Sequence, residues 1–238
     1  MLAHSDNLSC IALEWLEGES IGPVIRNSVG RVASPAARAL GSQLAFRVGK
    51  WLQKLATRTR CAASSLPAEE MHVRFLELLR MIDSGNSALL PKGKSAELLK
   101  LFEQCLGDAT PEEDCLVHND FWFDHIWTVG DQLVVIDFGR ARIGPAGRDA
   151  IQFYCRLLDI ATFNPMVSKR ARDKIIGSFI AGYGTLDAQS RISILWQLWT
   201  RAEQLAGLTE YVPADLRDKL TTYVRQKALV QQLTQLCS

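Results

Sequence analysis

Residues 115–144 read CLVHNDFWFDHIWTVGDQLVVIDFGRARIG and contain two short apolar runs, each followed by an aspartate. Asp120 follows the run CLV, and Asp137 follows the run LVVI. The Gly-Asp dipeptide at 130–131 is typical of a two-residue β-hairpin turn. The sequence therefore predicts two short strands around a tight turn. Because a hairpin brings its two open ends together, His125 is expected to lie beside Asp137, close enough to share a metal.

This spacing of carboxylates suits phosphoryl transfer to a hydroxyl, which requires positioning and charge stabilisation rather than covalent chemistry. One carboxylate orients the hydroxyl and accepts its proton, and another holds metal ions that bridge the nucleotide phosphates. Asp120 is the candidate for the first role and Asp137 for the second. An H-x-D or a DFG tripeptide alone can be an ordinary loop or turn. Their order, with a hairpin between them, favours phosphoryl transfer.

The remainder of the chain is predicted to be mostly helical, which makes the fold class α+β. A short strand is expected at 8–13, before a break at Gly18. Apolar residues at helical spacing predict helices at about 34–59, 67–82, 95–107, 148–161, 168–182, 187–206 and 213–235. Ser34 and Ser95 are expected to cap the first and third of these helices, and Gly107 to end the third.

Composition excludes several classes of protein. The chain has 238 residues, 47% of them hydrophobic, and a formal net charge of +1, as expected of a soluble globular protein. Charges of both signs are interspersed, which argues against a nucleic-acid partner. No apolar run reaches the roughly 18 residues of a membrane-spanning helix, and the first residues do not resemble a secretory signal. Six cysteines without a C-x-x-C pair favour a reducing, cytoplasmic setting.

HNDFWFDHI followed by VVIDFG resembles the catalytic and metal-binding segments of aminoglycoside phosphotransferase and choline kinase-like enzymes, which have the protein kinase-like fold. That family's usual pattern is His-Gly-Asp, four further residues, Asn, and then Ile-Asp-Phe-Gly. LEWLEG at 13–18 resembles the hinge between the two lobes, and SFIAGYG at 178–184 resembles a recurrent helix end. The resemblance covers 8–184 in patches. It implies a kinase-like C-terminal lobe at 21–238, with 1–20 as a hinge strand and remnant of a largely missing N-terminal lobe.

The resemblance also implies ATP and Mg²⁺, with Mn²⁺ as an option, as cofactors, and a hydroxyl of a small molecule or sugar as the acceptor. In the catalytic segment the resemblance implies that Asp120 is the catalytic base and that His118 supports its loop. It implies that Asp137 is the principal metal ligand, with His125 beside it, and that Asp149, in GPAGRDAIQF, anchors the lobe. Around the nucleotide it implies the backbone of Glu14, Trp15 and Leu16, together with Ile136.

Two features depart from the family pattern. His125 replaces the asparagine, although magnesium prefers oxygen ligands and imidazole suits zinc, manganese or iron better. Lipopolysaccharide-core sugar kinases are similar to this chain at that position, so His125 is either a metal or phosphate ligand or a non-catalytic replacement. The adjacent Asp124 is a weaker candidate ligand. Secondly, no glycine-rich loop precedes the hinge, and the first lysine, Lys50, is expected to face solvent.

Three explanations of the second departure stay open. The chain is a fragment of an active kinase, a degenerate kinase-like binding or scaffolding module, or one half of a site that a partner chain completes. Candidate acceptor-lining residues in the helical region are Trp196, Trp199, Arg201, Glu203, Glu210 and Tyr211. The tryptophans are alternatively core residues. Three arginines near the metal segment, Arg140, Arg142 and Arg148, either favour an anionic acceptor or belong to the surface.

Overall fold

The computed structural model describes residues 3–5, 10–12, 17–62, 68–84, 89–109, 113–162, 166–184, 186–211 and 215–237. The elements in chain order are β1 (Ala3–Ser5), β2 (Cys10–Ala12), β3 (Glu19–Ser20), α1 (Ile21–Ser28), α2 (Pro35–Arg58), α3 (Ala68–Ser84), α4 (Lys94–Asp108), β4 (Asp114–Val117), the 3-10 turn η1 (Phe123–His125), β5 (Ile126–Val129), β6 (Gln132–Val135), the 3-10 turn η2 (Phe138–Arg140), β7 (Arg142–Pro145), α5 (Arg148–Thr162), α6 (Lys169–Tyr183), α7 (Arg191–Glu210) and α8 (Leu216–Leu236). The predicted α+β class with a predominance of helix is confirmed.

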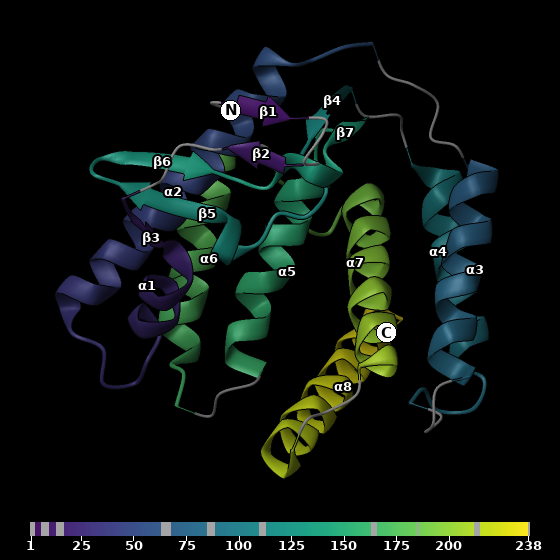
Figure 1. Ribbon diagram of the computed structural model, residues 1–238. Helices are drawn as coiled ribbons and strands as arrows, with labels where there is room; N and C mark the ends of the chain where they lie inside the picture. Colours follow the sequence, from purple (N-terminus) through teal and green to yellow (C-terminus); the bar gives the residue numbers. More distant parts are fainter. Residues whose placement is uncertain are drawn as a thin grey trace.

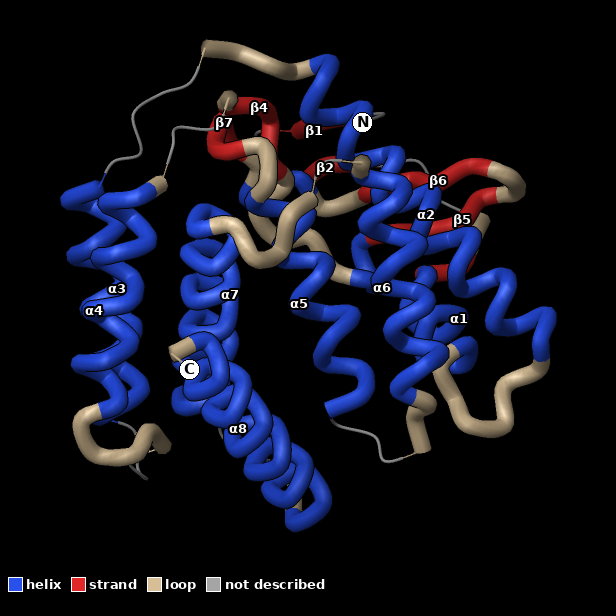
Figure 2. Tube along the Cα trace, turned by 180° about the vertical axis from the view of Figure 1, so that it is seen from behind, coloured by secondary structure: helices blue, strands red, loops and turns tan. Residues whose placement is uncertain are grey.

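The helices form a body with the strands gathered at one end. Figures 1 and 2 show α3 and α4 side by side at one flank, α1, α2 and α6 at the other, and α5 and α7 between them. The strands lie across the end of the body where α2 and α5 meet the hairpin. In the described part of the chain no helix is long and apolar enough to cross a membrane.

The predicted hairpin is present with the predicted turn. β5 and β6 are antiparallel, from Ile126 opposite Val135 to Val129 opposite Gln132. Gly130 in the turn has φ +55°, which glycine adopts without steric cost. β3 pairs with the other edge of β5, and β4 pairs with β7 in a separate two-stranded sheet. These two small sheets hold both ends of the segment that carries the aspartates.

Helix boundaries follow local capping chemistry, and one predicted cap is wrong. Ser34 caps α2 as predicted, because its hydroxyl accepts a hydrogen bond from the backbone N–H of Ala37 at 3.1 Å. Ser95, in contrast, lies inside α4 and donates its hydroxyl to Asp83 Oδ1 of α3 at 2.9 Å. Gly107 also lies inside α4 rather than ending it. The Ser95 hydroxyl therefore forms a hydrogen bond with α3 and does not cap α4.

Helix α1 was not predicted, and α7 begins later than predicted. Gly22 and Pro23 of α1 look like helix breakers in the sequence. In the first turn, however, a proline N–H would have no intrahelical partner, so its absence costs nothing. The predicted helix at 187–206 is observed as Arg191–Glu210, because Ser190 accepts a hydrogen bond from Ser193 N and caps it.

Two apolar clusters stabilise the body. The first lies between α3, α4, α7 and α8, where Phe75 stacks on Phe102 with ring centroids 4.0 Å apart. The second lies between α1, α2, α5, α6 and β5, and contains Phe121 and Phe123 of the predicted catalytic segment. The aspartate-bearing segment is thus anchored in the core by the aromatic residues on either side of Trp122.

Close approach of α2 and α6 depends on glycine. A Cβ on Gly182 would overlap the backbone carbonyl oxygen of Phe46, and a Cβ on Gly49 would overlap that of Phe179. Backbone atoms cannot rotate away as side chains can, so the helices would have to separate. The two glycines therefore fix the distance between α2, which lies under the hairpin, and α6.

Replacing Gly182 with alanine is expected to lower the free energy of unfolding by about 1–3 kcal/mol through overpacking. The matched control is Gly177→Ala on the same helix, where a Cβ meets nothing within 4 Å. There the better helix propensity of alanine should raise stability by about 0.5–1 kcal/mol. Urea unfolding of both variants measures the difference, and equal effects of the two would refute the close-contact explanation.

Candidate active site

The loop between β4 and β5 carries His118, Asn119 and Asp120. The side chain of His118 is fully buried. Its Nε2 lies 2.8 Å from the carbonyl oxygen of Ile136, so Nε2–H donates to that oxygen. This hydrogen bond joins the loop to the residue before Asp137. His118 therefore holds the two aspartate-bearing segments together and does not itself face the solvent.

Asp149, in the first turn of α5, holds the loop from below. Its two carboxylate oxygens accept hydrogen bonds from the backbone N–H groups of His118 at 2.6 Å and Asn119 at 2.9 Å. Burial raises the pKa of Asp149, while the two N–H donors oppose the rise by stabilising the carboxylate. One buried side chain thus fixes two consecutive peptide groups immediately before Asp120.

Two residues of the site have left-handed backbone conformations. Asn119 has φ +65° and Asp137 has φ +64°. Asparagine and aspartate are the non-glycine residues that tolerate this region best. Asn119 occupies the position of the glycine in the His-Gly-Asp pattern that this segment resembles, and its left-handed conformation is one that both glycine and asparagine adopt. At Asp137 the conformation turns the chain sharply at the end of the hairpin.

His125 lies beside Asp137, as the hairpin predicts. Its Nδ1 lies 2.8 Å from the backbone carbonyl oxygen of Asp120, so Nδ1–H donates to that oxygen. Its Nε2 lies 3.5 Å from Asp137 Oδ2. In the neutral ring the Nε2 lone pair therefore faces the carboxylate. The side chain of Asp137 is 59% exposed and that of His125 is 22% exposed, so both remain accessible to a ligand.

This donor set fits a metal that is shared with substrate phosphates better than a closed protein cage. Among the described residues no group of three or more His, Cys, Asp or Glu side chains could hold a metal ion. Magnesium in nucleotide enzymes usually takes only one or two carboxylates and completes its shell with waters and phosphate oxygens. The exposed side chain of Asp137 could supply such a carboxylate. The imidazole of His125 adds a nitrogen donor, which manganese accepts more readily than magnesium.

One face of α5 carries further contacts with the loop that the sequence analysis missed. Gln152 accepts a hydrogen bond from the backbone N–H of Phe121 at 2.6 Å, and the guanidinium of Arg156 lies over the Trp122 ring, 3.1 Å from its centroid. Burial lowers the pKa of Arg156 to about 10, while the charges of nearby carboxylates, Asp120 among them, oppose this. Asp149, Gln152 and Arg156 follow i, i+3, i+7 spacing, which places them on one face of a helix, and this spacing could have identified them in the sequence.

The tryptophans of α7 belong to the core. Trp196 and Trp199 are 3% and 6% exposed, and they pack in the cluster with Phe75 and Phe102. The guanidinium of Arg148 lies 5.0 Å from the Trp196 ring centroid and 3.9 Å from Glu203 Oε1. Burial lowers the pKa of Arg148. Of the two interpretations of these tryptophans, the core interpretation is confirmed.

The remaining predicted residues are dispersed. Arg201 is buried in α7 and donates to Asp159 Oδ1 at 2.5 Å and to the carbonyl oxygen of Cys155 at 3.0 Å. The exposed Tyr211 donates its hydroxyl to Asp218. The side chains of Asp124, Arg140 and Arg142 are exposed. The residues Glu14, Trp15 and Leu16, and the side chain of Glu210, lie outside the described part of the chain.

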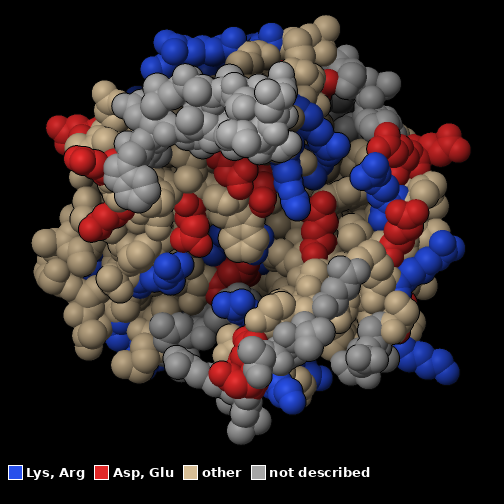
Figure 3. Space-filling view, in the orientation of Figure 1, with Lys and Arg blue, Asp and Glu red and all other residues tan. Residues whose placement is uncertain are grey.

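Figure 3 shows the surface around this segment. Acidic side chains gather around a hollow near the middle of the face, over the region between β5 and α5. Basic side chains border the hollow, so the face has no large area of one sign.

Solved structures of glucosamine kinase share the fold of this chain. A glucosamine kinase matches with a TM-score of 0.65 and 18% sequence identity, over 93% of this chain and 60% of that protein. A glucosamine kinase in complex with glucosamine, ADP and inorganic phosphate matches with a TM-score of 0.64 and 17% identity, over 92% and 58%. Spectinomycin phosphotransferase in complex with ADP and spectinomycin matches with a TM-score of 0.48 and 14% sequence identity, over 83% of this chain and 64% of that protein. The chain thus spans about 60% of the first of these glucosamine kinases.

Comparison by sequence is more specific than comparison by fold. No significantly similar sequence was found among curated proteins. The sequence profile of the Phosphotransferase enzyme family, in contrast, matches residues 3–192, which include the hairpin and both aspartates. The resemblance to aminoglycoside phosphotransferase and choline kinase-like proteins is thereby confirmed. The chain belongs to the Phosphotransferase enzyme family and has the helical, kinase-like lobe of that fold.

Proposed function

We propose that this chain carries the catalytic lobe of an ATP-dependent phosphotransferase that acts on a hydroxyl of a small molecule or sugar. The observation that supports this most strongly is the arrangement of Asp120, Asp137 and His125 on a loop and a hairpin that Asp149 and His118 tie together. A loop without a chemical role would not need two left-handed residues and a buried carboxylate to fix its shape.

In this proposal Asp120 orients the acceptor hydroxyl and accepts its proton as the phosphoryl group is transferred. Asp137 and the Nε2 atom of His125 hold the metal, which neutralises charge on the nucleotide phosphates when it is bound. His125 also fixes the backbone at Asp120 through its Nδ1–H. The two roles are therefore coupled, since one imidazole positions both the carboxylate loop and the metal ligand.

The nucleotide is proposed to bind along the hinge, with Ile136 beside it and the backbone of Glu14, Trp15 and Leu16 around the adenine. The chain spans about 60% of a related kinase structure. Further contacts with the phosphates are therefore proposed to come from polypeptide outside the described residues, in the same protein or in a partner chain. The division at residue 20 between hinge and helical lobe stays a prediction.

The acceptors to test first are an amino sugar, a neutral sugar and an amino alcohol, because the structural neighbours include kinases of glucosamine and a choline/ethanolamine kinase family protein. The chain is incubated with ATP, each acceptor and either Mg²⁺ or Mn²⁺, and products are followed by phosphorus NMR. A phosphomonoester resonance that requires both acceptor and metal is expected. If none forms with any acceptor while ATP binds tightly, the chain is a nucleotide-binding module instead.

A further inference from the structure

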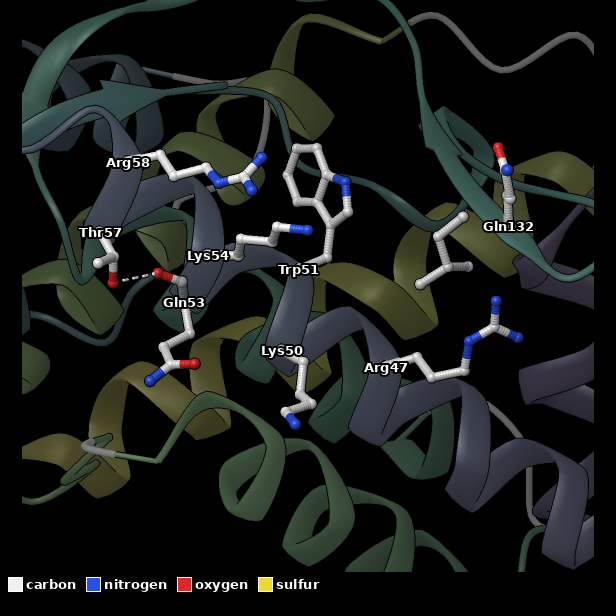
Figure 4. Close-up of a pocket in the computed structure, with 9 residues that line it drawn as sticks. Arg47, Lys50, Trp51, Gln53, Lys54, Thr57, Arg58 and Gln132 are labelled. Atoms are coloured by element: carbon white, nitrogen blue, oxygen red, sulfur yellow. Dashed lines mark hydrogen bonds between the residues drawn. The ribbon is translucent and has the colours of Figure 1, made fainter.

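A basic groove runs along the exposed face of α2 where it meets the hairpin. Its cavity volume is about 810 Å³, and the residues that line it are Arg47, Lys50, Trp51, Gln53, Lys54, Thr57, Arg58, Gln132 and Leu133. Figure 4 shows their side chains leaving the helix in several directions, with Arg47 toward Gln132 on β6 and Arg58 at the far end. An elongated ligand suits such a groove better than a compact one.

The charge of the groove is of one sign. Four of the nine lining residues are cations and none is acidic. Elsewhere on the surface the cations are often paired, as Arg60 is with Glu113 and Arg74 with Glu70. Within the described ranges, in contrast, no carboxylate lies within 4 Å of the charged groups of Lys50, Lys54 or Arg58. Their charges are therefore available to an anionic ligand.

The floor of the groove offers apolar surface and an unpaired strand edge. The Trp51 ring is half-buried and stacks on Phe121, with centroids 5.8 Å apart. β6 pairs with β5 on one side, and no described strand lies along its other side. The backbone N–H of Ile136 donates a hydrogen bond to the carbonyl oxygen of His125. In an antiparallel pair, residues that are hydrogen-bonded to the partner strand alternate with residues that are not. By this register the N–H and C=O of Leu133 point away from β5, to the open edge of β6.

We propose that this groove docks an acidic segment of a partner polypeptide in an extended conformation. Lys50, Lys54 and Arg58 repeat every four residues, which is about 6 Å along the helix. Acidic side chains on alternate residues of an extended peptide repeat at about 6.7 Å, so the two series match over three charges. The peptide backbone would pair with the open edge at Leu133, as in β-strand addition.

The alternative polyanions use fewer of these features. A nucleic acid or an inorganic polyphosphate would satisfy the lysines, but neither offers a peptide backbone to the edge of β6. Trp51 also connects the groove to the catalytic loop, because Phe121 directly follows Asp120. A segment docked in the groove would therefore be separated from the loop of Asp120 by the Trp51 and Phe121 rings, and would lie outside the proposed phosphotransfer site.

The test measures fluorescence anisotropy of a labelled nine-residue peptide with glutamate at alternate positions. The whole 238-residue chain is titrated at low salt. Changing the three cations together, Lys50→Glu, Lys54→Glu and Arg58→Glu, is expected to weaken binding at least tenfold, since each attraction becomes a repulsion. The same peptide with alternate N-methyl groups should also bind several-fold more weakly, because it cannot pair with β6.

The matched control changes three exposed cations of α6 together, Lys169→Glu, Arg170→Glu and Lys174→Glu, which alters the net charge equally. It should change binding less than twofold, and thermal melting verifies that both triple variants fold. Equal loss in the two variants, or no loss in the α2 variant, would overturn the groove assignment. A single-stranded oligonucleotide or polyphosphate of equal charge that competes as well as the peptide would overturn the choice of partner. Neither result depends on phosphotransfer activity.

Discussion

Replacing Asp137 with asparagine is expected to lower the rate of phosphoryl transfer by roughly 10²–10³-fold, with no loss of folding stability. The loss is the scale found when one preorganised charge-stabilising group is removed from a transition state. Asparagine is the appropriate substitution because Asp137 has φ +64°, a conformation that asparagine tolerates and alanine does not. Asp137→Ala would mix backbone strain with the loss of charge.

The control for this prediction is Asp131→Asn, which removes the same charge from the exposed turn of the same hairpin. Its rate should equal that of the unchanged chain. Binding of Mn²⁺ in the presence of nucleotide, followed by electron paramagnetic resonance, should weaken in the Asp137 variant and not in the Asp131 variant. Equal metal binding by both variants would show that Asp137 is not a ligand.

Replacing Asp149 with alanine is expected to lower the free energy of unfolding by about 3–5 kcal/mol. Two backbone N–H groups, those of His118 and Asn119, lose charge-assisted hydrogen bonds inside the protein, and each unsatisfied buried donor costs about 1–3 kcal/mol. In a chain of this size the melting temperature should fall by about 6–20 °C. Differential scanning calorimetry measures the shift.

The variant Asp149→Asn keeps the size of the side chain but removes its negative charge and one of its two acceptor oxygens. An amide has one acceptor oxygen, so it can keep one of the two hydrogen bonds but places an N–H₂ group against the other donor. Its loss of stability should therefore lie between those of the alanine variant and the unchanged chain. Asp173→Ala, at an exposed position of α6, is the control and should have little effect. An alanine variant as stable as that control would contradict the role of Asp149 as an anchor.

The hairpin and the pairing of His125 with Asp137 could be predicted from sequence because both depend on local rules. A two-residue turn fixes the register, and the period of two along each strand then fixes which residues face each other. The register pairs Ile126 with Val135, so His125 and Asp137 come to the same end of the hairpin. The distance of 3.5 Å between His125 Nε2 and Asp137 Oδ2 also depends on the 3-10 turn that ends at His125 and on the left-handed backbone of Asp137. Ser34 was predictable as a cap for the same reason, since its partner lies three residues away.

What could not be predicted depends on contacts between distant segments. Ser95 looks like a cap in sequence but bonds to Asp83 of α3, a partner that only the packing of two helices supplies. Gln152 and Arg156 contact the segment that follows Asp120 because α5 docks beneath it, over a separation of some 30 residues. Asn119, which has a left-handed backbone, likewise donates its N–H to Asp149, a residue 30 positions away in the sequence.

The proposed role of Asp120 is tested by the rate of phosphate transfer from γ-labelled ATP to an acceptor hydroxyl, compared between the unchanged chain and Asp120→Asn. Asparagine keeps the size of the side chain, and the backbone carbonyl that accepts from His125 is unaffected. If Asp120 accepts the hydroxyl proton, the kcat of the variant should be lower by roughly 10²–10⁴-fold while the affinity for nucleotide is unchanged. Equal rates for the two proteins would contradict the assignment of this loop as a phosphotransfer site.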